Sequence, residues 1–575
     1  MRVNLVQRCA LLVFAVLASA NKLPAAVVIE GVSDDISDAI SAQLTLGDNC
    51  ELADWLVRYR FLGSDREIKQ SLETFGYYNP VIDKQLDLAG ECWLAIFRID
   101  PGPPAMIQTA NVAILGEGRE LPELDRVIAT SSVQVGTRFD HETYESLKSG
   151  IENVAAHFGF LEGRFASHRV EVDIESNAVR VDLVYDTGPR FQFGAVTFNS
   201  DHLSEDVLKR YVPFEEGDVY DVEKLGELYQ SLLASGYFDD VILDTSRVDG
   251  KTVPVNVTLV FGKTSVTRIG IGYSTDLGPR LFIDRNRRLV NARGHQFQID
   301  ASVSPVERQV GGFYRIPQGE DKDGWVSLYG GYRVTDTDTS YQKKATMGIR
   351  QIVPRGGGWI ETRFFEIVNE QFEVADESNS NLSFVPGLNY SHTRTDSLAA
   401  RVRRAHRISF EVSGTSRSLG STLDFVSATS SAKMIRPLGD NLRVIARGRV
   451  GITRTEDFDR LPPNVRFFSG GDDRVRGFDF ESIGPLDESG NVIGGNRLLE
   501  LSTELDYRIG TNWGLAAFLD AASVSQSEFS SDFERGAGIG FRWYSPIGPV
   551  RFDIAKPLDR DDRSVRIHIS LGPDL

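Results

Sequence analysis

The second half of the chain alternates apolar and polar residues with a period of two. Between Leu442 and Ile452 the even positions hold Leu, Val, Ala, Gly, Val and Ile, whereas arginines stand at positions 443, 447 and 449. Alternation of this kind places one class of side chain on each face of a β-strand. Three arginines on one face cannot fill the dry core of a soluble protein, but they can line a wet lumen while the aliphatic face contacts lipid. The pattern therefore favours a transmembrane β-barrel over a soluble β-sandwich.

The same alternation continues to the end of the chain and sets the size of the expected barrel. Residues 265–575, at roughly ten residues per strand plus turns, correspond to about 16 strands. The first candidate strand is Val266–Thr275 and the last is Val565–Leu571. An even number of antiparallel strands brings these two together, so we expect a closed antiparallel barrel.

The first half of the chain contains a pattern that recurs three times. Each copy opens with a short apolar strand, continues through a helical region that ends in an aromatic–glycine signature, and closes with two strands. The signature glycines Gly76, Gly159 and Gly236 lie 83 and 77 residues apart. Glycine after a helix supplies a left-handed C-cap, and a regular period indicates one unit used repeatedly. The sequence therefore predicts three α+β modules of order βααββ. Their expected bounds are 27–104, 105–189 and 190–264.

Residues 1–26 are expected to be a removable signal peptide. Two arginines precede the apolar run Leu11–Leu17, and small residues allow cleavage after Ala20 or Ala26. This run is too short to span a bilayer, and no later stretch of about 18 apolar residues offers a transmembrane helix. A chain that enters a membrane without such helices has to do so as a closed barrel.

Charge and cysteine content narrow the choice of partners and compartment. The formal net charge is −18 and the pI is about 5.1. This balance argues against nucleic acid as a partner, because phosphate binding needs a basic face. Export favours a disulfide between Cys50 and Cys92, the two cysteines beyond the leader, over two buried thiols.

The stretch Arg466–Pro485 fits neither a strand, a helix nor an ordinary exposed loop, because it combines four glycines with two pairs of phenylalanines. Long loops of this kind carry function or pack inside something, and the barrel lumen shields their aromatic rings. Asp520 shares its parity with Phe518 on a strand whose leucines face lipid, so it points into the lumen. Arg476 is its expected partner, at about 1–3 kcal/mol for a bidentate pair in a partly wet lumen. An arginine exposed to solvent is the alternative.

These residues resemble known motifs. Val475-Arg476-Gly477-Phe478 is similar to the VRGF/Y loop motif of the BamA/TamA superfamily, and Phe518-Leu519-Asp520 is similar to its barrel-wall F-x-D motif. The three repeats resemble POTRA domains, the βααββ modules on the periplasmic side of outer-membrane assembly and secretion proteins. Within the superfamily the chain most resembles the TamA family, which has three such repeats. The matching segments are Gly270–Asp276, Arg466–Asp472, Trp543–Val550 and Leu571–Leu575.

The resemblance implies a location, a function and partners. The barrel is expected in the outer membrane of a Gram-negative bacterium, with the POTRA domains in the periplasm. The implied function is to assist insertion or translocation of autotransporter-type and other outer-membrane proteins. The implied partners are these unfolded clients, outer-membrane lipid, and an inner-membrane-anchored TamB-like protein held by the POTRA domains, whose exposed sheet edges can accept an extended chain. The Cys50–Cys92 pair departs from the family pattern and is expected to be a local addition.

The resemblance also implies a lateral gate between the first and last strands. Ile271 and Gly272 lie on the first strand, Ile569 lies on the last, and Gly572 and Pro573 follow it. Proline lacks an N–H and glycine allows a kink, so strand pairing should fail at this point. An opened seam offers unpaired backbone groups to an incoming strand and perturbs the nearby lipid.

The sequence contains no motif for bond-making chemistry. It lacks HExxH, Walker, CxxC and nucleophile-elbow motifs, and its eight histidines are scattered. The glycine-rich run Gly536–Gly540 is not a phosphate loop, because a strand continues through it with no helix behind it; its small residues are expected to make room for a packed loop. We therefore expect no catalytic residue, no metal and no cofactor. The alternative functions are a dedicated secretion pore or passive channel, and an envelope lipid-transport component that acts with its partner.

Overall fold

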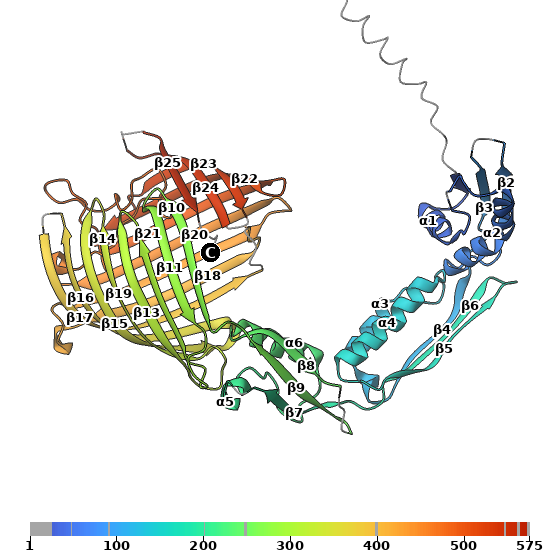
Figure 1. The fold of residues 1–575 in the computed structure, drawn as a ribbon. Helices are drawn as coiled ribbons and strands as arrows, with labels where there is room; N and C mark the ends of the chain where they lie inside the picture. The colour runs from blue at the N-terminus through green and yellow to red at the C-terminus, as the bar shows by residue number, and fades with distance from the viewer. Residues whose placement is uncertain are drawn as a thin grey trace, which may run out of the picture. The chain divides into compact units, whose positions relative to one another are not determined.

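The computed structural model describes residues 26–47, 49–89, 92–200, 202–246, 250–375, 377–396, 401–545, 548–560 and 564–571. The expected signal peptide, apart from Ala26, lies outside the described residues, and so do Gly572 and Pro573 of the expected seam. The chain forms three small three-stranded sheets followed by a closed barrel, β10 to β25 (Figure 1). This arrangement confirms the predicted fold class of three βααββ modules and a barrel of 16 antiparallel strands.

The three modules share one order of elements. The first contains β1 (Ala26–Glu30), α1 (Asp34–Gln43), α2 (Asp54–Thr74), β2 (Val81–Asp87) and β3 (Leu94–Asp100). The second contains β4 (Met106–Leu115), η1 (Glu117–Glu120), α3 (Pro122–Thr130), α4 (His141–His157), β5 (Arg164–Asp173) and β6 (Ala178–Asp186). The third contains β7 (Gln192–Asn199), α5 (Glu205–Lys209), α6 (Val222–Ala234), β8 (Phe238–Asp244) and β9 (Thr252–Phe261). In each sheet the last strand lies between the other two, in the orders β1-β3-β2, β4-β6-β5 and β7-β9-β8.

Helix α4 shows why these sequences form these elements. The Asp140 side chain accepts a 2.7 Å hydrogen bond from the backbone N–H of Thr143 and caps the first turn. Tyr144, Leu147 and Ile151 follow at helical spacing and are buried against the sheet. The helix ends before Gly159, whose φ of 89° is left-handed, as expected of a C-cap glycine. Local capping and an apolar stripe therefore suffice to place this helix on its sheet.

Cys50 and Cys92 are joined by a disulfide in the first module. They lie in the segments that precede α2 and β3, 42 residues apart. Closing a loop of this length removes unfolded-state entropy worth about 4 kcal/mol in the simplest model. The bond thus links two irregular segments beside the small core that contains Trp93 and Leu46.

Internal packing divides the chain into two compact units, and the division runs through the third module. The first unit consists of Met1–Val196, Phe214–Gly226 and Asp244–Val255. The second consists of Thr197–Pro213, Glu227–Leu243 and Asn256–Leu575. In the second unit the Arg210 guanidinium donates to the backbone carbonyls of Gln318 and Gly324, and Tyr237 Oη donates to the carbonyl of Gly294. Part of the third module is therefore fastened to the hairpin turns of the barrel.

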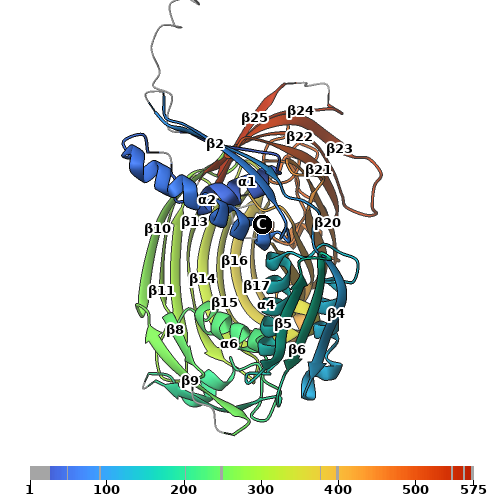
Figure 2. The same cartoon turned by 90° about the vertical axis from the view of Figure 1, so that its right-hand side faces the viewer.

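The barrel strands are joined in sequence order by antiparallel ladders. They are β10 (Ser265–Ser274), β11 (Gly278–Arg287), β12 (Gln296–Val303), β13 (Glu307–Pro317), β14 (Trp325–Asp336), β15 (Ser340–Arg355), β16 (Trp359–Val374) and β17 (Glu377–Thr395). The remainder are β18 (Ala405–Thr415), β19 (Phe425–Pro437), β20 (Leu442–Thr455), β21 (Arg497–Ile509), β22 (Trp513–Ser525), β23 (Glu534–Ser545), β24 (Gly548–Pro557) and β25 (Arg566–Leu571). Short 3-10 turns are η2 (Gly356–Gly358), η3 (Arg417–Leu419) and η4 (Phe458–Arg460). Figure 2 shows β13 to β17 following one another around the wall.

The two faces of the barrel wall have opposite chemistry. Each of the sixteen strands exposes at least one large apolar side chain, such as Ile271 on β10 or Leu519 on β22. Buried charged groups, among them Arg443, Asp520 and Arg542, point inward. This apolar-out, polar-in arrangement is that of a barrel embedded in lipid. None of the described helices is long and apolar enough to cross a membrane.

Candidate functional site in the barrel lumen

The connection between β20 and β21, residues 456–496, folds back inside the barrel. Isolated bridges join Phe467 to Gly495 and Ser469 to Ile483, so part of the loop is paired with itself. Val475 and Phe478 are buried against Ala522 of β22. The loop is therefore a packed structural element and not an exposed connection.

A glycine in the wall makes this close packing possible. A Cβ atom added to Gly536 of β23 would lie 1.9 Å from the backbone oxygen of Arg476. Real Cβ atoms do not approach an oxygen so closely, so any side chain at position 536 would displace the loop. The glycine-rich run is a wall strand against which the loop backbone lies, in agreement with the role expected for its small residues.

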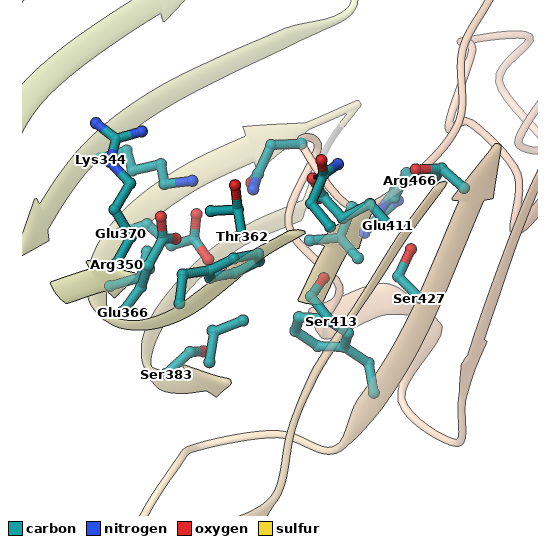
Figure 3. A pocket seen from close by; sticks show the side chains of 18 of the residues that line it. Lys344, Arg350, Thr362, Glu366, Glu370, Ser383, Glu411, Ser413, Ser427 and Arg466 are labelled. Atoms are coloured by element: carbon teal, nitrogen blue, oxygen red, sulfur yellow. Dashed lines mark hydrogen bonds between the residues drawn. The ribbon is translucent and has the colours of Figure 1, made fainter. Parts of the chain in front are cut away.

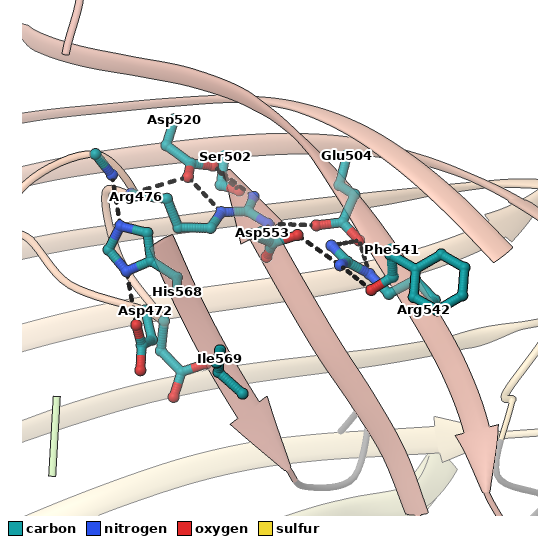
Figure 4. Close-up of polar contacts among 12 residues, drawn as sticks. Asp472, Arg476, Ser502, Glu504, Asp520, Phe541, Arg542, Asp553, His568 and Ile569 are labelled. Atoms are coloured by element: carbon teal, nitrogen blue, oxygen red, sulfur yellow. Dashed lines mark hydrogen bonds and ion pairs between the residues drawn. The ribbon is translucent and has the colours of Figure 1, made fainter. Parts of the chain in front are cut away.

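Arg476 lies against Asp520 of β22 (Figure 4). Its Nε donates to Asp520 Oδ2 at 2.7 Å and its Nη2 donates to Oδ1 at 3.0 Å, which is a bidentate pair. The backbone N–H of Arg476 also donates to Asp520 Oδ2 at 3.1 Å. Asp520 thus holds both the side chain and the main chain of the loop at this residue.

Further charged groups surround this pair. Arg476 Nη1 donates to Glu504 Oε2 at 2.6 Å and to Asp553 Oδ2 at 3.2 Å. Arg542 donates to the other oxygen of Glu504 at 2.9 Å and also contacts Asp553. Three guanidinium groups and three carboxylates therefore meet inside the wall. They belong to Arg447, Arg476, Arg542, Glu504, Asp520 and Asp553.

The centre of this charge cluster is dry. The side chains of Arg476 and Asp520 are 3% and 0% exposed. The Arg476 guanidinium lies over the Phe518 ring, 3.4 Å from its centroid, in cation–π contact. The partly wet environment expected from the sequence is wrong at this point, because the loop itself excludes water from its anchor. Breaking a buried pair of this kind on one side costs about 3–5 kcal/mol.

The opposite part of the lumen holds a polar cavity of about 520 Å³. Figure 3 shows labelled polar and charged side chains around it, among them Lys344, Glu366 and Glu370. Arg466, at the start of the loop, borders the same space and donates to three backbone carbonyls, those of Leu461, Ile493 and Asp459. The lumen therefore has a packed side, where the loop meets β21 to β25, and a hollow side.

The seam between the first and last strands is the weakest junction among the described strands of the barrel. β10 and β25 share one described ladder pair, Ser274 with Ser570, whereas β10 and β11 share ten. Thr275 adds three hydrogen bonds to Ile569. Its N–H and its hydroxyl donate to the Ile569 carbonyl, and the Ile569 N–H donates to the same hydroxyl. Most of β10 has no described strand partner on this side.

The expected seam residues occupy different places in this junction. Ile271 is 79% exposed on the outer face of β10, next to Gly272. Ile569 lies opposite Thr275, so it does not face Ile271 directly. A bond across the seam therefore has to join Ser274 to Ser570, not positions near Ile271 and Ile569.

Asp520 is the only partner of Arg476 that the sequence pattern predicts, and the described contacts add Glu504 and Asp553. Glu504, Asp553 and His568 alternate with apolar residues along their strands, which places them on the charged faces but does not join them to the loop. Strand parity shows that such side chains point inward, whereas only the three-dimensional register shows that they converge on one residue. Arg542 and Asp472 were missed as members of the site, although the inward parity of Arg542 could have revealed it.

Comparison with known proteins gives matches along most of the chain. Residues 293–574 match the Omp85 superfamily domain, residues 26–101 match the POTRA domain called TamA domain 1, and residues 191–262 match a POTRA model described as a surface antigen variable number repeat. The chain is 23% identical to outer membrane protein assembly factor BamA of Nitratidesulfovibrio vulgaris over 464 residues, 73% of this chain and 56% of that protein. It is 22% identical to BamA of Neisseria meningitidis serogroup B over an alignment of 609 positions, gaps included, which covers 90% of this chain and 74% of that protein.

A solved structure shares the fold. The crystal structure of BamA from Haemophilus ducreyi lacking POTRA domains 1-3 superposes with a TM-score of 0.66 at 16% identity. The match covers 81% of this chain and 99% of that one. The chain spans little more than half the length of BamA from Nitratidesulfovibrio vulgaris, so the similarity covers only part of that protein.

Replacing Gly536 with Ala tests the packing of the loop against the wall. We expect Gly536→Ala to weaken the folded barrel, because the new Cβ overlaps the Arg476 carbonyl oxygen. Gly448→Ala on β20 is the matched control, since its Cβ would meet Leu501 at an ordinary 3.6 Å. Thermal unfolding, followed by the heat-dependent mobility of the barrel on gels, measures both variants. Equal midpoints for the two variants would contradict the packing described.

Reversing the charges of Arg476 and Asp520 tests whether they form an isolated pair or part of a network. Arg476→Asp and Asp520→Arg should each destabilise the barrel by about 3–5 kcal/mol. The double reversal should fail to restore stability, because an aspartate at position 476 would face Glu504 and Asp553. The same unfolding measurement applies, and full rescue by the double variant would show that Glu504 and Asp553 do not matter.

Proposed function

The chain belongs to the Omp85 superfamily, and from this membership we propose that it assists the insertion or translocation of autotransporter-type and other outer-membrane proteins. The barrel lies in the outer membrane, with the POTRA domains in the periplasm. The BamA relatives are named as outer membrane protein assembly factors, which supports the proposal. The proposed activity rearranges strands and lipid and needs no catalytic residue.

The weak seam is the observation that carries the proposal. The unpaired N–H and C=O groups of an edge strand form a template for another strand. On its seam side β10 has one described ladder pair, so opening the seam breaks few hydrogen bonds. An incoming client strand can pair with the freed edge and then leave sideways into the membrane. Strand pairing and the burial of apolar surface in lipid drive this process, so no nucleotide is required.

The lumen loop contributes to this mechanism as a fixed support. The cluster around Arg476 holds the loop against β21, β22 and β24, in the part of the wall that ends with β25 at the seam. The wall on this side therefore stays rigid while the terminal strands separate. In this proposal Val475, Arg476, Gly477 and Phe478 anchor the loop, with Phe518 and Asp520 as their wall partners.

The match of residues 26–101 to a TamA-type POTRA domain supports a narrower assignment within the superfamily. On this basis the chain is the outer-membrane component of a translocation and assembly module. Its POTRA domains would then bind an inner-membrane-anchored TamB-like protein. A contribution to lipid transport between the membranes is a further activity that such a partnership allows.

A dedicated secretion pore or passive channel is the second candidate, and the polar cavity of about 520 Å³ is the observation that favours it. Against it, the loop fills the other side of the lumen. We expect the purified protein in planar bilayers to show only small, brief openings, because the loop is anchored by buried ion pairs. A large and stable single-channel conductance would favour the pore.

Locking the seam tests the assembly function. A disulfide between Ser274→Cys and Ser570→Cys, which are ladder partners, should abolish the assisted insertion of a urea-unfolded outer-membrane barrel into liposomes. Reductant should restore the activity. The control is Ser409→Cys with Ser431→Cys, ladder partners on β18 and β19, where the bond should leave activity intact. Full activity of the locked Ser274–Ser570 variant would rule out the lateral route.

A further inference from the structure

Three polar residues from three separate segments meet at the seam. Asp276 lies in the turn between β10 and β11, Asp472 lies in the lumen loop, and His568 lies on β25. His568 Nδ1 is 2.7 Å from Asp472 Oδ1, and both side chains are almost fully buried (Figure 4). Asp472 and Asp276 exchange hydrogen bonds, each accepting one from the backbone N–H of the other, at 3.2 and 2.7 Å. The loop is thus bonded to both sides of the seam.

The hydrogen bonds define the state of His568. Its Nε2 accepts a 2.9 Å bond from the backbone N–H of Gly477, so this nitrogen carries no proton. Its Nδ1 therefore carries the proton and donates it to Asp472. Both ring nitrogens are used by the loop, one at Gly477 of the anchor motif and the other at Asp472. His568 joins the last strand to the loop at two points.

Close packing around Asp276 shows that the loop and the turn fit each other. A Cβ atom at Gly471 would lie 2.4 Å from Asp276 Oδ2, and the φ of Gly471 is 103°. Only glycine allows the loop backbone to reach the turn in this way. A chain of contacts therefore runs from the turn after β10 through the loop to β25, in addition to the one described ladder pair of the seam.

We propose that Asp472 and His568 are positioning residues that, together with Asp276, hold the seam closed; we call these three residues the clasp. The turn after β10, the loop and β25 can then separate from one another only in one concerted step. The biological meaning of this clasp rests on the proposed function, because a seam that opens for clients has to be held shut between them. The coupling itself is a property of this chain. With the ladder reduced to one described pair, the clasp adds four hydrogen bonds that link the two sides of the seam through the loop.

The clasp is expected to weaken as pH rises. Burial, together with the negative charge of Asp472, raises the pKa of Asp276 to about 7. The groups that face it are Asp472 and Asp473 from the loop and His568 from β25. In an opened seam Asp276 returns to an ordinary pKa near 4. The closed state therefore binds the extra proton between about pH 4 and 7, so the clasp is strongest below this range, weakens through it and stays weak above pH 7.

Hydrogen exchange on the full chain in lipid tests the coupling. In His568→Phe we expect exchange to rise at least tenfold in three segments: β25, the loop around Gly477, and the turn around Asp276. The described hydrogen bonds of His568 reach Gly477 and Asp472 but not this turn. His568→Gln should stay near the wild type, since an amide can donate to Asp472 and accept from Gly477. His406→Phe on β18 is the matched control and should leave all three segments unchanged. Faster exchange in β25 and the loop with an unchanged turn would overturn the proposal.

The reciprocal variant and a pH series complete the test. Asp276→Ala, which removes the acceptor for the Asp472 N–H, should raise exchange around Gly477 and in β25, whereas Asp473→Ala should not. This comparison tests the coupling even if His568→Phe fails to fold. Spin labels at Ile271 and Ile567, both exposed, report the opened population. That population should rise up to about tenfold per pH unit between pH 5 and 7, and Asp276→Asn should flatten the rise. A flat wild-type profile would overturn the clasp but leave the proposed function standing. Full activity of the locked Ser274–Ser570 variant would instead overturn the proposed function and leave the clasp standing.

Discussion

A buried arginine has to be neutralised, and this constraint organises the C-terminal half of the protein. Arg476 is 3% exposed, so its charge requires partners that are fixed before it arrives. Asp520, Glu504 and Asp553 come from β22, β21 and β24, which are brought together only by a closed and correctly registered wall. The loop can therefore dock only when the barrel has formed, and once docked it keeps these strands in register.

The barrel wall is strongly paired beside the Arg476 anchor and weakly paired at the seam. Beside the charge cluster the ladders are long, with thirteen pairs between β21 and β22 and ten between β22 and β23. At the seam one described pair remains, and the loop reaches over it through Asp472 and His568. The proposed lateral opening needs this contrast, because a barrel with equally paired strands would have no preferred place to open.

Much of the fold follows from patterns that are visible in the sequence. Two-residue alternation and the length of the second half predicted about 16 strands, and the expected bounds of the first and last strands lie within one residue of those of β10 and β25. The glycines at 76, 159 and 236 marked the helix ends of the modules, and each has the left-handed φ expected of a cap. Parity alone pointed Asp520 inward. The sequence did not show that the side chains of Glu504, Asp553 and Arg542 meet around Arg476. Their meeting depends on strand register and shear, which local patterns do not encode. The sequence also did not reveal that the site is dry, because water is excluded only when the loop docks against the registered strands.

The most direct test of the account is to ask where a client first touches the barrel. A photoreactive amino acid at Ile271 on β10, or at Val412 on β18, can be activated while an unfolded outer-membrane barrel is being inserted; both positions are exposed on the outer face. The account predicts cross-links from position 271 to a terminal strand of the client and few from position 412. Equal cross-linking from the two positions, or none from 271 during productive insertion, would contradict the view that clients enter the membrane through the seam.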